Sequence, residues 1–272
     1  MPLALILSSY VAASRVGGMA QALALAALSV DPVVVPTVFF GRHPGRGAPG
    51  GGPIPIGTFN GVLAGLEADG LFARADLVIT GYFANADQVR SAGGAIDAVR
   101  AARPVARIIV DPIMGDSGRL YVSLEVAEAI AADLVPRADL ITPNAWELER
   151  LSSLPINGAD DAVRAARSLG KPVLVSSVPC GEEIGVVFAD ANHAWLAVHP
   201  RAVKAPNGTG DLLTALVAAA LVKGLAPDQA LTNAVGGVAE AVLTADADEL
   251  PIVAMGARLG LASSRVRVER LD

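Results

Sequence analysis

The chain has 272 residues, of which 53% are hydrophobic and 18% are charged, with a formal net charge of −6. This composition excludes intrinsic disorder, and the length suffices for one large α/β domain with a sizeable buried core. The sequence lacks the basic cluster that nucleic acid binding needs, and no apolar run reaches the roughly 18–20 residues of a membrane span.

The first residues and the single cysteine suggest where the protein works. Residues 1–7 are apolar, but no Lys or Arg precedes them, so they lack the basic region of a secretory signal and predict a buried strand. A lone cysteine, Cys180, excludes an internal disulfide and a site built from several thiolates. We therefore expect a soluble, cytoplasmic protein.

Short runs rich in Val, Ile and Leu alternate with Ala-rich segments of helical period. The runs lack polar alternation, which is typical of parallel strands covered by helices on both faces. The predicted strands are residues 3–7, 33–38, 77–80, 108–110, 140–142 and 173–175. Runs 185–188 and 194–198 are too close for an intervening helix and predict an antiparallel hairpin at one edge. The pattern predicts a single α/β domain over residues 1–272 with a central, mostly parallel sheet.

One segment interrupts this alternation. Residues 41–57 contain seven glycines and four prolines. Loops of this length inside a compact domain are usually functional lids or disordered links. Both interpretations stay open at this point, and we favour a lid.

The strongest chemical signal is the stretch Asn-Gly-Thr-Gly-Asp at residues 207–211, which precedes an almost wholly apolar run at residues 212–222. The run predicts a buried helix, so the loop leads into a helix N-terminus. Its two glycines let backbone N–H groups point outward, and the helix dipole adds partial positive charge, which together make an anion hole. Asp211 can then act as a general base toward a substrate hydroxyl during phosphoryl transfer. The alternative is that Asp211 only caps the helix.

Polar residues at the ends of predicted strands support the catalytic interpretation. Open α/β sheets bind their ligands at the carboxyl ends of the strands. The residues at or just beyond these ends are Ser9, Tyr82, Asp111, Thr142 and Ser176. Their shared position predicts one ligand site along this edge of the sheet.

Three carboxylates near the same edge predict a magnesium site. Asp111 and Asp116 bound the turn Asp-Pro-Ile-Met-Gly-Asp, and Glu147 lies at the start of a predicted helix. Mg²⁺ binds one or two carboxylates together with water and substrate phosphates. Glu147 has a second interpretation, because Asn144 followed three residues later by Glu forms a capping box. The two roles are compatible.

Other kinds of site are excluded by their missing motifs. No Gly-x-x-x-x-Gly-Lys-Ser/Thr loop occurs, because Gly170 and Lys171 are followed by Pro172. No Gly-x-Gly-x-x-Gly follows the first strand, and no Gly-x-Ser-x-Gly elbow is present. The three histidines are isolated in the sequence, which disfavours a histidine metal site.

Taken in order, these motifs resemble the pyridoxal kinases of the ribokinase superfamily over nearly the whole chain. The Gly-Thr-Gly-Asp stretch at residues 208–211 marks the superfamily. The narrower signals are the Asp-Pro-Ile-Met-Gly-Asp turn at 111–116 and the Thr-Pro-Asn-Ala-Trp-Glu-Leu-Glu stretch at 142–149. The pair Gly81-Tyr82 points to pyridoxal kinase within the superfamily.

The resemblance implies a ribokinase-like fold and ATP-dependent phosphorylation of the 5′-hydroxyl of pyridoxal, and of pyridoxine or pyridoxamine, in vitamin B6 salvage. It also implies a homodimer, Mg²⁺ and a monovalent cation such as K⁺ or Na⁺. Asp211 would be the base, and Gly208, Thr209 and Gly210 the anion hole. The implied substrate contacts are Ser9, Phe40, His43 and Tyr82. The implied nucleotide residues are Asp111, Thr142, Glu147, Ser176 and Ser177, and the implied metal ligands are Asp111, Asp116 and Glu147.

The sequence departs from the family pattern on the substrate side. Where the family commonly has Tyr-Gly-His-x-Gly-Asn, residues 13–18 read Ala-Ser-Arg-Val-Gly-Gly. After His43, residues 44–46 read Pro-Gly-Arg in place of Thr-x-Tyr, which removes a hydroxyl and an aromatic group from the predicted lid. Two alternatives stay open: a hydroxymethylpyrimidine kinase of the same superfamily, and a kinase-fold protein that binds a ligand without catalysis.

Overall fold

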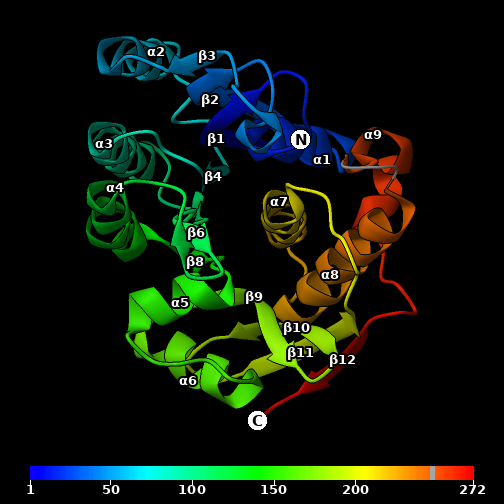
Figure 1. The fold of residues 1–272 in the computed structure, drawn as a ribbon. Helices are drawn as coiled ribbons and strands as arrows, with labels where there is room; N and C mark the ends of the chain where they lie inside the picture. The colour runs from blue at the N-terminus through cyan, green and yellow to red at the C-terminus, as the bar shows by residue number, and fades with distance from the viewer. Residues whose placement is uncertain (246–248) are drawn as a thin grey trace.

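The computed structural model describes residues 1–245 and 249–272. In this part of the chain the largest element is a ten-stranded sheet (Figure 1). Its strands in spatial order are β12 (Arg267–Arg270), β11 (Ala194–Pro200), β10 (Glu183–Ala189), β9 (Val173–Cys180), β8 (Leu140–Ile141), β5 (Arg107–Val110), β4 (Leu77–Thr80), β1 (Leu3–Val11), β2 (Asp31–Phe40) and β3 (Gly51–Pro53). A separate two-stranded ribbon joins β6 (Gly115–Asp116) to β7 (Arg119–Leu120).

The centre of the sheet is parallel and its two sides are antiparallel. Strands β9, β8, β5, β4, β1 and β2 pair in parallel. Strand β3 is antiparallel to β2 on one side, and β10, β11 and β12 form an antiparallel group on the other. This topology confirms the predicted α/β class with a mostly parallel central sheet.

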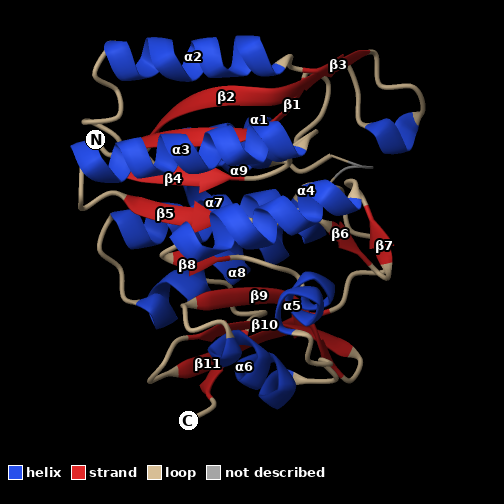
Figure 2. Cartoon of the chain, turned by 90° about the vertical axis from the view of Figure 1, so that its left-hand side faces the viewer, coloured by secondary structure: helices blue, strands red, loops and turns tan. Residues whose placement is uncertain are grey.

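Helices cover both faces of the sheet (Figures 1 and 2). One face carries α1 (Gly17–Ala27), α7 (Thr209–Val222), α8 (Pro227–Thr244) and α9 (Ile252–Met255). The other carries α2 (Ile56–Ala68), α3 (Ala86–Ala102), α4 (Leu124–Ala129), α5 (Ala145–Ser152) and α6 (Ala159–Ser168). Helix α4 continues as a π-helical turn, Ile130–Leu134, and 3₁₀ turns occupy Val135–Arg137, Pro44–Arg46 and Gly256–Gly260. No helix of the described residues is long and apolar enough to cross a membrane.

Strand β1 shows why the central strands lack polar alternation. Ala4 and Ile6 belong to the core with α1, α7 and α8, whereas Leu5 and Leu7 belong to the core with α2 and α3. Both faces of the strand therefore meet apolar helices, and no position along its first half needs to be polar. Helix α7 is enclosed in the same way, because every residue from Asp211 to Leu221 is buried.

Several elements differ in extent from the prediction. Strands β1, β2 and β9 continue beyond their predicted ends, because neighbouring strands still offer pairing there, as in Tyr10 with Phe39 and Val178 with Gly185. The β10–β11 hairpin is antiparallel as predicted, but its place at the edge is wrong. Strand β12 pairs with β11 and forms the outermost strand. The charged sequence of β12 gave no strand signal.

Residues 41–57 contain more regular structure than their glycines and prolines suggest. The segment includes the 3₁₀ turn Pro44–Arg46, strand β3 and the first residues of α2. Strand β3 pairs with the end of β2 through Phe40 and Gly51. The segment thus extends the sheet beside its carboxyl edge, and its role as a lid stays a prediction.

The contact between α8 and the 3₁₀ turn Gly256–Gly260 makes stability sensitive to side-chain size at one position. A Cβ atom at Gly237 would lie 2.0 Å from the Leu259 carbonyl oxygen and 2.8 Å from Leu216 Cδ1. We expect Gly237→Ala to lower the free energy of unfolding by about 1–3 kcal/mol, the usual cost of overpacking. In Gly65→Ala, the matched control in α2, the new methyl group meets no atom within 4 Å. It should raise stability by about 0.5–1 kcal/mol. Urea denaturation measures both, and changes of the same sign would contradict this prediction.

Candidate active site

The carboxyl ends of the parallel strands form one edge of the sheet, and two short β elements, β3 and the β6–β7 ribbon, lie beside it. Strand β3 follows the end of β2, and the β6–β7 ribbon follows the end of β5. Both lie at the same end of the molecule, on the right of Figure 2. Helix α1, which follows β1, contacts the first turn of α7 here, because the Gly17 N–H group donates to Asp211. Most of the residues predicted to form the site gather at this edge.

Asp211 is buried in the first turn of α7, with 8% of its surface exposed. Its Oδ2 accepts the hydrogen bond from the backbone N–H of Gly17 at 2.8 Å, and its Oδ1 has no hydrogen-bond partner among the described residues. The helix begins after Gly208 without a side-chain cap, so the interpretation of Asp211 as a helix cap is wrong. Burial raises the pKa of Asp211 to about 6, although the Gly17 hydrogen bond lowers it. A carboxylate with this pKa is suited to accept a proton near neutral pH.

The loop before α7 has the backbone geometry that an anion hole needs. Gly208 adopts a left-handed conformation with φ of 90°, and a Cβ atom there would lie 2.3 Å from the Arg15 carbonyl oxygen. Only glycine fits this position. Thr209 and Gly210 form the first turn of α7, whose N–H groups have no partner within the helix. The space beside Gly210 is open, since a Cβ atom there would meet no atom within 4 Å.

A chain of hydroxyl groups links two strand ends to α7. The Thr214 hydroxyl donates to Asp111 Oδ2 at 3.1 Å, and its oxygen lies 2.8 Å from Thr142 Oγ1. Asp111 and Thr142 follow β5 and β8, and Thr214 lies one helical turn beyond Asp211 on the same face. The two strand ends are therefore fixed against the helix that carries the proposed base.

Glu147 forms the predicted capping box with Asn144 at the start of α5. Its carboxylate also accepts hydrogen bonds from the N–H groups of Met114, at 2.8 Å, and Gly115, at 3.2 Å. It thereby fixes the turn after β5, where the Gly115 backbone packs against Trp146. Burial raises the pKa of Glu147 to about 7, against the lowering effect of these backbone donors.

Asp111, Glu147 and Asp211 form a buried acidic cluster. Burial raises the pKa of Asp111 well above its ordinary value, and the negative charges of Glu147 and Asp211 raise it further. In the part of the chain that the structure describes, no group of three or more His, Cys, Asp or Glu side chains is arranged to hold a metal by itself. In proteins, Mg²⁺ typically binds one or two carboxylates and takes its remaining oxygen ligands from phosphate and water.

Asp116 lies apart from this buried cluster. It is exposed in β6, and its carboxylate accepts a hydrogen bond from the Ser117 hydroxyl at 3.2 Å. Its charge still acts on Glu147, whose pKa it raises. Its role as a metal ligand stays a prediction.

Of the predicted substrate residues, Ser9 lies close to the proposed base and Tyr82 follows the neighbouring strand. Ser9 is buried within β1, and a Cβ atom at Gly17 would lie 2.0 Å from Ser9 Oγ. Gly17 therefore contacts both Ser9 and Asp211. Tyr82 follows β4, the parallel neighbour of β1, and its carbonyl accepts a hydrogen bond from Thr37 Oγ1 at 2.6 Å. Its half-buried ring can line the same edge, and burial raises the pKa of its hydroxyl.

Phe40 and His43 lie where β2 leads into the segment 41–57. Phe40 is the last residue of β2 and pairs with Val11 in β1. His43 is half-buried, and its Nδ1 accepts the N–H of Gly45 at 3.1 Å, which caps the following 3₁₀ turn. Burial and the neighbouring Arg46 lower the pKa of His43, so the imidazole is favoured in its neutral form.

Ser176 and Ser177 lie inside β9, and Ser9 lies inside β1, so the predicted place of Ser176 and Ser9 at strand ends is wrong. Strand β9 continues because β10 pairs with it as far as Cys180. Ser177 has a left-handed backbone, with φ of 61°, at an irregularity in this pairing. Ser176 donates its N–H to the Pro143 carbonyl at 3.0 Å, which holds β9 beside Thr142. Both serines remain next to the stretch predicted to contact the nucleotide.

Two contacts of this site were not predicted from the sequence. Thr214 joins Asp111 to Thr142, and its signal is that it is the only polar residue in the apolar run 212–222. Gly17 donates to Asp211, but it falls in the stretch that departs from the family pattern. Nothing in that stretch indicates its partner, which is distant in sequence.

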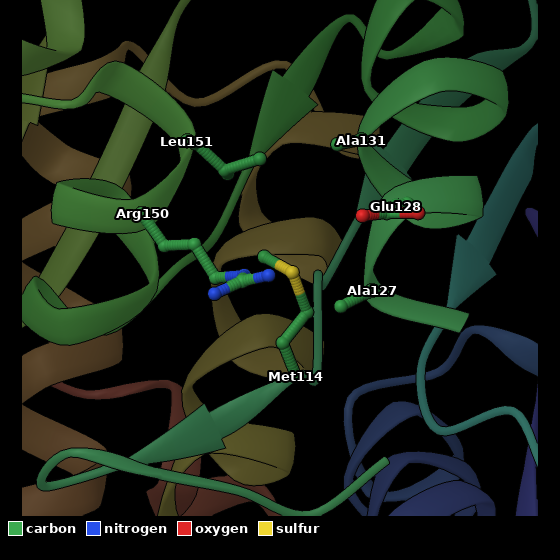
Figure 3. Close-up of a pocket in the computed structure, with 6 residues that line it drawn as sticks. All are labelled: Met114, Ala127, Glu128, Ala131, Arg150 and Leu151. Carbon is green, nitrogen blue, oxygen red and sulfur yellow. The ribbon is translucent and has the colours of Figure 1, made fainter. Parts of the chain in front are cut away.

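A pocket of about 330 Å³ lies between α4 with its π-helical continuation and α5 (Figure 3). It is lined by Met114, Ala127, Glu128, Ala131, Arg150 and Leu151. The Arg150 guanidinium lies beside the Met114 side chain in this view. The lining includes none of the residues predicted to bind substrate, nucleotide or metal. The pocket adjoins the acidic cluster, because Met114 also donates its N–H to Glu147.

Comparison with known proteins places the chain in one family. The model of the phosphomethylpyrimidine kinase family matches residues 73–250. The chain is 36% identical to the pyridoxine/pyridoxal/pyridoxamine kinase of Bordetella avium over 82% of this chain and 78% of that protein. It is 32% identical to a pyridoxal kinase of Rubrobacter xylanophilus over 98% of this chain and 97% of that protein.

Solved structures give the same assignment. Pyridoxal kinase from Entamoeba histolytica superposes with a TM-score of 0.93 at 25% identity, covering 100% of both chains. Pyridoxal kinase from Leishmania donovani in complex with ADP and pyridoxine gives a TM-score of 0.92 at 27% identity, covering 99% of both chains. These likenesses favour pyridoxal kinase over the pyrimidine kinase alternative. The chain thus belongs to the phosphomethylpyrimidine kinase family and, within it, to the pyridoxal kinases.

Proposed function

We propose that this chain transfers the terminal phosphoryl group of ATP to the 5′-hydroxyl of pyridoxal, as a step in vitamin B6 salvage. The observation that carries the proposal is the buried Asp211 carboxylate, whose Oδ1 has no partner among the described residues and whose helix begins at an open glycine loop. The relatives named as pyridoxal kinases support the choice of substrate.

Asp211 accepts the proton of the 5′-hydroxyl as that oxygen attacks phosphorus. Gly17 holds Oδ2 through its N–H group, which leaves Oδ1 for the substrate. The N–H groups of Gly208, Thr209 and Gly210 and the dipole of α7 stabilise the charge that develops on the phosphoryl oxygens. Because the donors are backbone groups fixed by the helix, they need little rearrangement during transfer.

The acidic cluster supplies the side chains for a magnesium ion. Asp111 and Glu147 would hold it, with Asp116 from the β6–β7 ribbon as a further ligand. When bound, Mg²⁺ neutralises phosphate charge and orients the transferring group. On the same edge, Thr142, Ser176 and Ser177 contact the nucleotide, as the neighbouring β8 and β9 bring them alongside one another.

The pyridine ring lies against Ser9 and Tyr82, with Phe40 and His43 toward the segment 41–57. Closure of this segment as a lid excludes water from the transferring phosphoryl group. The proposal also includes a homodimer, a monovalent cation such as K⁺ or Na⁺, and a cytoplasmic location. The homodimer and the cation rest on the family resemblance, and the location rests on the single cysteine, Cys180.

The activity itself is tested by a coupled assay of ATP consumption with pyridoxal, pyridoxine, pyridoxamine and hydroxymethylpyrimidine. We expect pyridoxal to react with a high KM and only modest preference over the other two vitamers. The predicted lid lacks a hydroxyl and an aromatic group of the family pattern. Each missing contact should weaken discrimination among the vitamers by roughly 10- to 200-fold. Turnover of hydroxymethylpyrimidine alone would contradict the proposed substrate. Binding of a vitamer without turnover would favour a ligand-binding protein.

Asp211→Asn should lower kcat by roughly 10²-fold or more, because the amide keeps the volume of the side chain and loses its basicity. Asp228→Asn is the matched control, since Asp228 also lies in the first turn of a helix, α8, and should leave kcat unchanged. In the parent protein kcat/KM should fall below pH of about 6, where Asp211 becomes protonated. Near-normal turnover of Asp211→Asn would exclude Asp211 as the base.

Asp111→Asn should separate metal binding from stability. The folded-state pKa of Asp111 is raised, so the protonated carboxyl favours the folded state and the ionised carboxylate disfavours it. The stability that the protonated form provides is therefore lost as pH rises. Removing the charge should keep or raise Tm without metal and abolish the rise in Tm that Mg²⁺ with ADP produces in the parent protein. Glu67→Gln in α2 is the control and should keep that rise. An unchanged response to Mg²⁺ in Asp111→Asn would remove Asp111 from the metal site.

A further inference from the structure

Glu249 joins two loops that the proposed mechanism leaves unconnected. Its Oε1 accepts a hydrogen bond from the Ser14 hydroxyl at 3.1 Å, and its Oε2 accepts the backbone N–H of Arg15 at 2.9 Å. The Arg46 guanidinium lies 2.7 Å from the same Oε1. One carboxylate near the C-terminal end of the chain therefore holds both stretches in which the sequence departs from the family pattern.

The first of these loops is in direct contact with the proposed base. Two residues after Arg15, the N–H of Gly17 donates to Asp211 Oδ2 at 2.8 Å. The Arg15 carbonyl oxygen and Val16 Cα lie 2.3 and 3.2 Å from the position of a Cβ atom at Gly208. Displacement of the Arg15 backbone would therefore move the donor to Asp211 and the wall of the anion hole together.

The second loop carries a predicted substrate residue. Arg46 closes the 3₁₀ turn Pro44–Arg46 by donating its N–H to the His43 carbonyl at 2.9 Å. The charges of Arg46 and Glu249 both act on the His43 imidazole. Anchoring of Arg46 by Glu249 thus contributes to where His43 lies relative to the edge of the sheet.

The contacts of Glu249 differ in strength. The Arg46 ion pair is partly exposed, with 34% and 36% of the two side chains accessible, so it contributes little to global stability. The bond from the Arg15 N–H to the ionised carboxylate is charge-assisted and stronger than a neutral one. The expected effect of Glu249 is therefore on the position of the two loops rather than on folding.

We infer that Glu249 is a positioning residue that couples the placement of the segment 41–57 to the placement of Gly17 against Asp211. This inference rests on the proposed function. It adds a residue outside the site that affects substrate binding through Arg46 and phosphoryl transfer through Arg15.

Three substitutions separate these effects. Glu249→Gln keeps an oxygen for the Arg15 N–H and loses the ion pair, so KM for pyridoxal should rise by up to about fivefold with kcat unchanged. Arg46→Met removes every contact of that guanidinium, so it should raise KM at least as far. Glu249→Ala loses both contacts, so kcat should also fall by roughly ten- to a hundredfold, the scale of misplaced catalytic groups. Equal kcat in the Ala and Gln variants, or no change in KM in either, would overturn the inference.

Hydrogen exchange tests the coupling without turnover. Amides of residues 45–47 should exchange faster in all three variants, and those of residues 15–17 only in Glu249→Ala. Glu183→Gln is the matched control, because Glu183 pairs with Arg267 at the same 2.7 Å distance between β10 and β12. It should change neither kinetics nor exchange at these loops. If the parent protein fails to phosphorylate any vitamer, the proposed function falls, whereas unaltered exchange at both loops in Glu249→Ala would refute the coupling itself.

Discussion

Enclosure of α7 is the constraint on which the rest of the structure depends. A 14-residue helix with apolar side chains on every side is stable only if the sheet and other helices cover it completely. Helices α1 and α8 and the central strands provide that cover in one continuous core. Its N-terminus then opens at the carboxyl edge of the sheet, and the first-turn residue Asp211 enters a region of low dielectric. The position and the raised pKa of Asp211 both follow from how its helix is buried.

The same enclosure gathers negative charge in a buried place. Asp111, Glu147 and Asp211 come from three different elements, and burial raises the pKa of each. Hydrogen bonds from Gly17, Met114, Gly115 and Thr214 fix these carboxylates in place. The fold therefore holds its acidic groups rigidly at a cost in electrostatic energy. Under the proposed function, a cation that binds among them lowers this cost and brings substrate phosphate with it.

The sequence predicted the fold, and it predicted that most residues of the candidate site meet at one edge, because both depend on local pattern. Residues close together in the sequence determine the strand runs, the buried helix at residues 212–222 and the Asn144 capping box. The polar residues at strand ends meet because parallel strands share one edge. Contacts between distant residues had no such signal. Three such contacts depend on which distant segments the tertiary fold brings together. They are the Glu249 link to Arg15 and Arg46, the Gly17 bond to Asp211 and the pairing of β12 with β11.

The packing of Trp146 against Gly115 also has a practical use. The chain contains two tryptophans, and they lie in different surroundings. Trp146 contacts the backbone of the β6–β7 ribbon beside Glu147, whereas Trp195 stacks on His193 in the antiparallel part of the sheet. A Trp195→Phe protein would therefore emit fluorescence from one indole beside the acidic cluster. Its emission spectrum follows the local environment of the ribbon directly, with no attached dye.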